Sequence, residues 1–213
     1  MIKFWSSFII LEFKKVCLVI FIALALLAAY ASISFAAVGC SLNDPDRDVK
    51  RLFPEATGYK TDFITVKEAG GEELFKKIEQ ELGGKLDTLY ETIDVPYAFY
   101  DVLKGKEVIA HIHGVNQKGI YGGMQIILAT DLKGKILHFY YQKMSSPEAS
   151  KFMDNNFTRQ FASLSLDDFI QGKISIKDPT KESHEDFLAT LRGVKKNLIL
   201  LKELKINRKP GTK

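Results

Sequence analysis

A long stretch without charge constrains this chain more than any other feature. Residues 16–43 contain no charged side chain, whereas the residues after them have the mixed composition of a globular domain. The apolar core of the stretch, residues 16–39, would span a hydrocarbon layer of roughly 30 Å as a helix rising about 1.5 Å per residue. We therefore expect an N-terminal segment with a membrane-anchor helix, residues 1–43, and one exported domain, residues 44–213.

Two other readings of the N-terminal segment compete with the anchor. A cleaved signal peptide has a shorter apolar stretch, of about 7–15 residues. Residues 37–40 resemble a lipoprotein signal that ends in an acylated cysteine, Cys40. Length favours the uncleaved anchor over acylation. Lys14 and Lys15 abut the apolar run, which favours a cytoplasmic N-terminus and a C-terminal domain on the extracytoplasmic side of the cell membrane.

Composition excludes several functions for the exported domain. Cys17 lies in the expected span and Cys40 at its end, so residues 44–213 contain no cysteine. The domain therefore has no disulfide, no thiolate metal site and no cysteine nucleophile. Its net charge is half of the +4 of the whole chain, which gives no reason to expect a nucleic-acid partner.

The residue pattern of the domain predicts an α+β fold with a mostly antiparallel sheet covered by helices. Alternation and turn residues predict strands over residues 62–67, 97–103, 107–115, 124–130 and 135–143. The segments that join the last four strands in two pairs contain Gly105 and Gly134, as tight hairpins do. Because residues 124–130 are apolar on both faces, we expect this strand to be central.

Three helices are expected around the sheet. Leu74, Phe75, Ile78 and Leu82 recur at helical spacing, and glycines follow them. Ser146 before a proline predicts an N-cap and a short helix that ends near residue 153. Ser183 and Asp186 resemble a capping box at the start of the last helix, which carries an apolar stripe to Leu201.

Histidines offer one possible metal or haem site. His111 and His113 are two residues apart on one strand, so both side chains point to the same face of the sheet. His138, on a neighbouring strand, is the third candidate ligand. The alternative is that these histidines are packed or surface side chains.

A glycine-rich turn is a stronger candidate for a binding site. Residues 119–123 open the buried strand with backbone that a ligand can approach closely and with one aromatic ring, Tyr121. The order of this turn, of residues 52–56 before it, and of residues 130–136 and 157–161 after it resembles the FMN-binding domain family. That family is found in the extracytoplasmic flavin subunits of Rnf-type electron transport complexes and of sodium-translocating NADH:quinone oxidoreductases.

The resemblance covers roughly residues 48–201 and implies an electron-transfer component of a membrane redox complex with other subunits, rather than a stand-alone enzyme. It implies one FMN, held in the family by a phosphoester to a threonine that matches Thr180 by position. Tyr121 would shield the flavin ring, while Gly122 and Gly123 would allow its approach. Ser145, Ser146 and Thr180 would contact its phosphate or ribityl groups.

The chain departs from the family at the attachment stretch. Asp178 and Pro179 stand where the family has glycine and alanine, and a carboxylate beside a phosphoester is unfavourable. Lys177 and Lys181 could offset this repulsion, so we expect any FMN to be bound non-covalently. The alternative is a flavin-free binding or structural subunit that keeps the fold.

Overall fold

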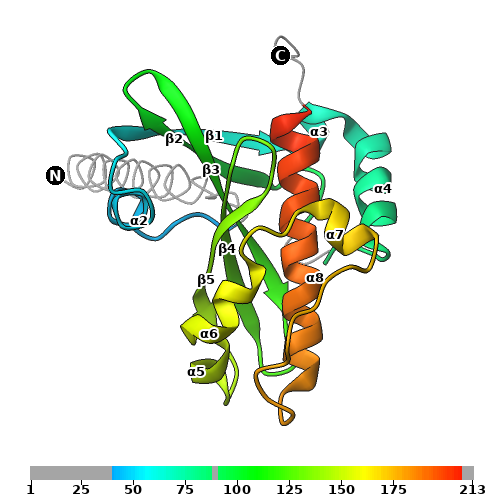
Figure 1. Ribbon diagram of the computed structural model, residues 1–213. Helices are drawn as coiled ribbons and strands as arrows, with labels where there is room; N and C mark the ends of the chain where they lie inside the picture. Colours follow the sequence, from blue (N-terminus) through cyan, green and yellow to red (C-terminus); the bar gives the residue numbers. More distant parts are fainter. Residues whose placement is uncertain (1–39, 88–90, 208–213) are drawn as a thin grey trace, which may run out of the picture. The chain divides into compact units, whose positions relative to one another are not determined.

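Five antiparallel strands, paired in the order of the sequence, form the framework of the domain (Figure 1). The structure, a computed structural model, describes residues 40–87 and 91–207, and the expected anchor helix lies outside them. The strands are β1 (Gly58–Thr65), β2 (Pro96–Lys104), β3 (Glu107–Lys118), β4 (Gly123–Thr130) and β5 (Ile136–Met144). The predicted antiparallel sheet is therefore confirmed.

Strand order corrects one detail of the prediction. β3, not β4, is the middle strand, because β1 adds to the sheet beside β2. β4 is nevertheless paired on both sides and buried on both faces, as its continuous apolar sequence indicates. Gly105 and Gly134 adopt positive φ in the two hairpins, which a residue with a side chain would do only under strain.

Helices surround the sheet, and several short ones were not expected from the sequence. The helical segments are α2 (Pro45–Leu52), α3 (Val66–Ala69), α4 (Gly71–Leu82), α5 (Ala149–Phe152), α6 (Asn155–Thr158), η1 (Arg159–Phe161), α7 (Leu166–Ile170), α8 (His184–Leu201) and the π-helical η2 (Lys202–Ile206). Asp44 caps α2 by accepting the N–H of Arg47, with Pro45 at the first helical position.

Two predicted helix starts are wrong in detail. α8 follows Ser183 as expected, but no capping hydrogen bond forms from this side chain. Asp186 instead accepts the backbone N–H of Ile120, in the glycine-rich turn. The helix expected from Ser146 begins only at Ala149, because the Ser146 hydroxyl accepts the N–H of Glu148 in a tight turn.

Each face of the sheet has its own apolar cluster. On one face, which we call the α8 face, α4, α8 and an aromatic group from β5, α5, α6 and η1 cover the strands (Figure 1). The opposite face, which we call the N-terminal face, is covered by residues 40–56. The buried members of this cover are Cys40, Leu42, Val49, Phe53 and Ala56.

The domain thus includes residues that precede the boundary expected at 43/44. Cys40 and Leu42 are buried, and Leu42 donates its backbone N–H to the hydroxyl of Tyr100 on β2. Within residues 40–87 and 91–207, no helix has both the length and the apolar content that crossing a bilayer requires.

Candidate functional site

The glycine-rich turn between β3 and β4 is fixed from two sides. Gly119 donates its N–H to the carbonyl of Gly122 (2.8 Å), and Ile120 donates to Asp186 of α8 (2.9 Å). A side chain at Gly119 would overlap Asp186, since a Cβ there would lie 2.5 Å from its carboxylate oxygen. The turn is therefore locked onto the first turn of α8.

One cavity, of about 540 Å³, lies beside Pro179. Another cavity, of about 530 Å³, borders the glycine-rich turn. We call the latter the glycine cavity. It is lined by Asp87, Asn116, Gln117, Lys118, Gly122, Gly123, Met124, Gln125 and Lys143. Its size falls within the range of about 300–1,000 Å³ that is typical of small-molecule sites. A Cβ at Gly123 would meet no atom within 4 Å, so the missing side chain leaves open space.

Two features of the glycine cavity suit an anionic ligand with polar groups. Lys118 and Lys143 are exposed at its wall, and in the described part of the chain neither forms an ion pair. Gln117 is buried, and its side-chain oxygen lacks a hydrogen-bond partner among the described residues. A buried polar atom without a partner is rare and is satisfied when a ligand or water donates to it.

Thr180 is in a different environment, which is closed and acidic. Its hydroxyl is buried and lies 3.3 Å from the carboxylate of Glu148 and within hydrogen-bond distance of the carboxylate of Glu182. The hydrogen bond from Thr180 is the largest cause that lowers the pKa of Glu182, so this carboxyl is ionised at neutral pH. Lys151 pairs with Glu148.

The segment before Thr180 adds a further carboxylate. Asp178 accepts the backbone N–H of Thr180 (3.0 Å) and pairs with the ring of His184 (2.7 Å). Asp178, which departs from the family pattern, therefore has a structural role in this chain. The carboxylates of Asp178, Glu148 and Glu182 surround the position to which a flavin phosphate would be esterified, and they would repel it.

The two predicted serines connect these regions. A Cβ at Gly122 would lie 3.0 Å from the Cβ of Ser145, so this serine packs behind the turn. The hydroxyl of Ser146 lies 3.5 Å from that of Ser183, at the start of α8. Neither serine lines the glycine cavity.

Of the six predicted site residues, Gly122 and Gly123 therefore lie at the cavity. Ser145 lies behind it, and Ser146 lies beside Ser183 at the start of α8. Thr180 belongs to the cluster of Glu148, Asp178 and Glu182, which we call the acidic cluster. Tyr121 projects from the turn with 54% of its surface exposed. Sequence reasoning missed the cavity residues Gln117, Lys118 and Lys143. Lys118 directly precedes the glycine-rich turn, and this was the available signal for it.

The three histidines do not gather. His113 is fully buried on the α8 face, where its Nδ1 lies 2.9 Å from the carbonyl of Ala98 and its ring stacks on Phe99. His111 pairs with Asp101 on the same face. His138 contacts Phe53, on the N-terminal face. No cluster of three metal-ligating side chains occurs among the described residues.

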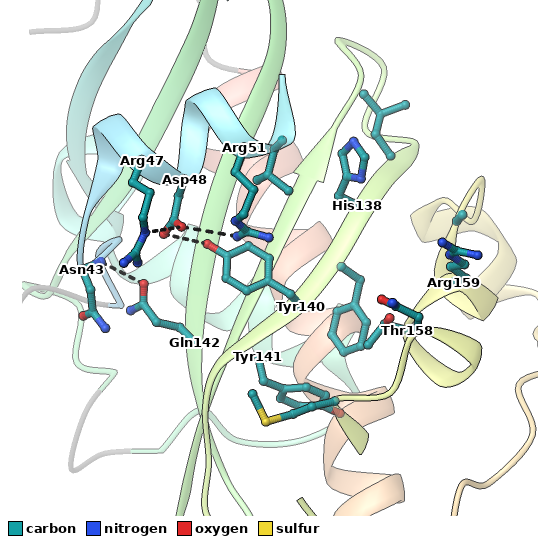
Figure 2. A pocket seen from close by; sticks show the side chains of 16 residues that line it. Asn43, Arg47, Asp48, Arg51, His138, Tyr140, Tyr141, Gln142, Thr158 and Arg159 are labelled. Atoms are coloured by element: carbon teal, nitrogen blue, oxygen red, sulfur yellow. Dashed lines mark hydrogen bonds and ion pairs between the residues drawn. The ribbon is translucent and has the colours of Figure 1, made fainter. Parts of the chain in front are cut away.

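A larger hollow, of about 740 Å³, follows the outer edge of β5. We call it the β5 groove. Figure 2 shows Arg47, Asp48 and Arg51 of α2 on one side of β5 and Thr158 and Arg159 on the other. Its floor is the strand itself, residues 137–142.

The comparisons with known proteins found a similarity of structure and none of sequence. No family model matches the chain, and no curated protein sequence matches it. The fold is similar to that of NqrC. The crystal structure of NqrC from Shewanella oneidensis aligns with 79% of this chain and 90% of its own, at 12% sequence identity and a TM-score of 0.49.

Proposed function

We propose that this protein is a membrane-anchored electron-transfer domain that binds FMN non-covalently in the glycine cavity. The observation that carries the proposal is the combination of open backbone at Gly123 with the unpaired cations Lys118 and Lys143. Planar cofactors need close backbone approach, and a phosphate needs cations or N–H donors.

Each cavity group has a role in this proposal. Gly122 and Gly123 let the ring system lie against the start of β4, and the exposed ring of Tyr121 covers it from the turn. Lys118 and Lys143 neutralise the phosphate, and Gln117 accepts a hydrogen bond from the cofactor. FMN supplies the redox chemistry by accepting and releasing electrons, while the protein positions it and tunes its surroundings.

Covalent attachment is not part of the proposal, because Thr180 does not fit a phosphoester. Its hydroxyl is already engaged by Glu148 and Glu182, and Thr180 does not line the cavity beside Pro179. Ser145 and Ser146 then support the turn rather than contact the phosphate.

The proposal places the domain on the extracytoplasmic side of the membrane, where it exchanges electrons with other subunits of a redox complex. The support is the uncharged stretch of residues 16–39 together with the family resemblance of the sequence. A domain that starts directly after an anchor stays close to the bilayer, where partner subunits would lie.

The acidic cluster favours a second candidate function. Because the hydroxyl of Thr180 is already hydrogen-bonded to Glu148 and Glu182, the fold could persist as a flavin-free docking subunit. The two candidates differ in one observable property, which is whether the protein binds FMN.

Flavin absorbance of the full chain tests the proposal. The protein is purified in detergent from cells supplied with flavin, titrated with FMN, and denatured to see whether pigment stays with the polypeptide. We expect binding, and complete release on denaturation. Gly123→Val fills the open space and should weaken FMN binding at least about tenfold, or about 1.4 kcal/mol. Gly58→Val is the matched control, since Gly58 is also a strand residue with open space at its Cβ position.

Three outcomes contradict the proposal. Protein that neither carries nor takes up FMN points to the docking subunit. Equal loss of binding in Gly58→Val and Gly123→Val removes the cavity from the explanation. Pigment that survives denaturation in the wild type and disappears in Thr180→Val would demonstrate the covalent bond that the acidic cluster disfavours.

A further inference from the structure

The outer edge of β5 is open for hydrogen bonding along most of its length. Its first residue, Ile136, exchanges two backbone hydrogen bonds with Ser163 and Leu164. Beyond Ile136, no backbone hydrogen bond joins this edge to another segment within residues 40–87 and 91–207. An unpaired edge presents alternating N–H and C=O groups, which is the template for another extended strand.

The walls of the β5 groove carry positive charge. Arg47 and Arg51 come from α2, and Arg159 comes from η1 on the other side of the strand (Figure 2). The one acidic residue of the lining, Asp48, is buried and already engaged by Arg51 (3.3 Å) and by the hydroxyl of Tyr140 (3.1 Å). Arginine therefore dominates the field that a ligand meets.

One arginine is positioned before any ligand arrives. The guanidinium of Arg51 lies over the ring of Tyr140 at 4.5 Å from its centroid, and its NH2 group contacts Asp48. Such stacking limits the freedom of the side chain, so less entropy is lost when it binds a carboxylate. Arg159 is exposed and forms no ion pair with any described residue, so it is available.

Apolar side chains complete the groove. Leu137 and Met153 both line the groove, and they are 39% and 50% exposed. In strand addition, backbone hydrogen bonds give affinity, while alternate side chains of the incoming segment fill pockets beside the strand. The β5 groove offers both elements, with arginine on its two walls.

We propose that the β5 groove binds an extended acidic segment of a partner protein, which adds to the sheet as a sixth strand beside β5. Carboxylates of the segment pair with Arg51 and Arg159, and its apolar side chains contact Leu137 and Met153. A second copy of this chain is the poorer occupant, because pairing β5 with β5 would bring like-charged arginines together. The β5 groove and the glycine cavity share no lining residue, so this inference does not depend on FMN binding.

Peptide selection on the full chain in detergent tests the inference. A displayed library of random short peptides is selected for binding, and the enriched sequences are synthesised with a fluorescent label. We expect enrichment of aspartate and glutamate, and slowed amide hydrogen exchange within residues 137–142 when the labelled peptide is bound. Arg159→Glu should weaken its binding at least tenfold. Arg51→Gln should also weaken its binding, although this variant additionally removes the ion pair with the buried Asp48.

The control variant is Lys106→Glu, which reverses an exposed charge in the β2–β3 hairpin and should leave peptide affinity unchanged. Enriched peptides without acidic residues, or protection from exchange elsewhere than β5, would overturn the inference. Two other results would also do so. One is arginine-dependent binding to phosphatidylglycerol vesicles with no peptide binding, and the other is a dimer whose formation protects β5.

Discussion

The two faces of the sheet are covered in different ways. On the α8 face, the 18-residue helix α8 and a group of phenylalanines form a deep core. On the N-terminal face, a single stretch of chain, residues 40–56, lies over the strands. The cover of the α8 face comes from several segments of the domain, whereas the cover of the N-terminal face directly follows the expected anchor.

On each face of the sheet, one glycine lies where the covering segment and a strand approach each other closely. A Cβ at Gly193 of α8 would lie 2.4 Å from the Cδ1 of Ile126, so the helix packs tightly against β4. A Cβ at Gly114 of β3 would lie 2.8 Å from the backbone oxygen of Cys40. The flexible end of a side chain can move aside, while a backbone group moves only with its segment. The same substitution should thus act differently on the two faces.

The largest expected effect concerns the depth of the two cores. Phe161 is fully buried on the α8 face, 4.3 Å from the ring of Phe139 by centroids. Phe161→Ala should reduce the free energy of unfolding by about 3–5 kcal/mol. Phe53→Ala, on the N-terminal face, should cost about 1–2 kcal/mol less, because residues 40–56 can collapse into the space. Urea unfolding followed by circular dichroism measures both, and equal losses would remove the distinction between the faces.

A buried histidine makes the stability of the α8 face depend on pH. Burial lowers the pKa of His113 to about 4. Its neutral form is kept in the folded state, so the stability that it contributes is present above its unfolded pKa of about 6.5 and is lost as pH falls toward 4. The loss should approach about 3 kcal/mol between these values.

The free energy of unfolding, measured from pH 7 to pH 4, tests this prediction. His113→Leu should flatten that part of the profile. His184→Gln, which changes a histidine with an exposed side chain, should keep the wild-type slope. A slope that persists in His113→Leu would assign the pH dependence to other groups.

An ion-pair network at the end of the chain should have a smaller effect. Lys205 of η2 lies 2.5 Å from Asp62 and 2.8 Å from Asp101. Burial acts to raise the pKa of both carboxyls, but His111 at Asp101 and Lys205 at both lower it overall. Lys205→Met should cost about 2 kcal/mol at pH 7, as expected for hydrogen bonds to charged groups.

The sign of the pH dependence provides the check for Lys205. Carboxyls with a lowered folded pKa stabilise the protein above the unfolded value, near 4, and this contribution is lost as pH falls further. The difference between wild type and Lys205→Met should therefore shrink at pH 3. Lys60→Met is the control, because the exposed pair of Lys60 with Asp62 is worth about 0–1 kcal/mol.

The smallest expected effect concerns the N-terminal face alone. In a Cys17→Ser background, Cys40 is the single thiol of the chain. It is buried, and burial raises its pKa to about 12, so a thiol reagent should modify it only when residues 40–56 leave the sheet. Gly114→Ala should speed labelling about tenfold, which corresponds to about 1.4 kcal/mol. Gly193→Ala should leave the labelling rate nearly unchanged.

The sequence indicated the sheet well, because hairpin glycines and alternation are local signals. The prediction was wrong where the hydrogen-bond partner of a side chain comes from a distant part of the sequence. Asp186 has the spacing of a capping box, yet the N–H of Ile120 competes for its carboxylate, and only the fold brings these residues together. The helix α2 was missed although Asp44 before Pro45 is a local start signal.

The candidate site was predictable to a similar extent. Gly122 and Gly123 stood out because glycine has few roles in a strand start other than a turn or close approach. Lys143 and Gln117 could not be assigned from spacing, since they come from different strands. The saturation of Thr180 by Glu148 depends on contact across more than thirty positions of the chain and has no local sequence signal.

The buried position of Cys40 sets an order of events. An enzyme that attaches a lipid to this thiol must reach it while residues 40–56 are still extended, before they dock on β3. Once the domain has matured, the sulphur is shielded, and a chain that escaped modification would keep a reduced, unreactive cysteine. Folding of the N-terminal face and any processing of Cys40 therefore exclude each other in time.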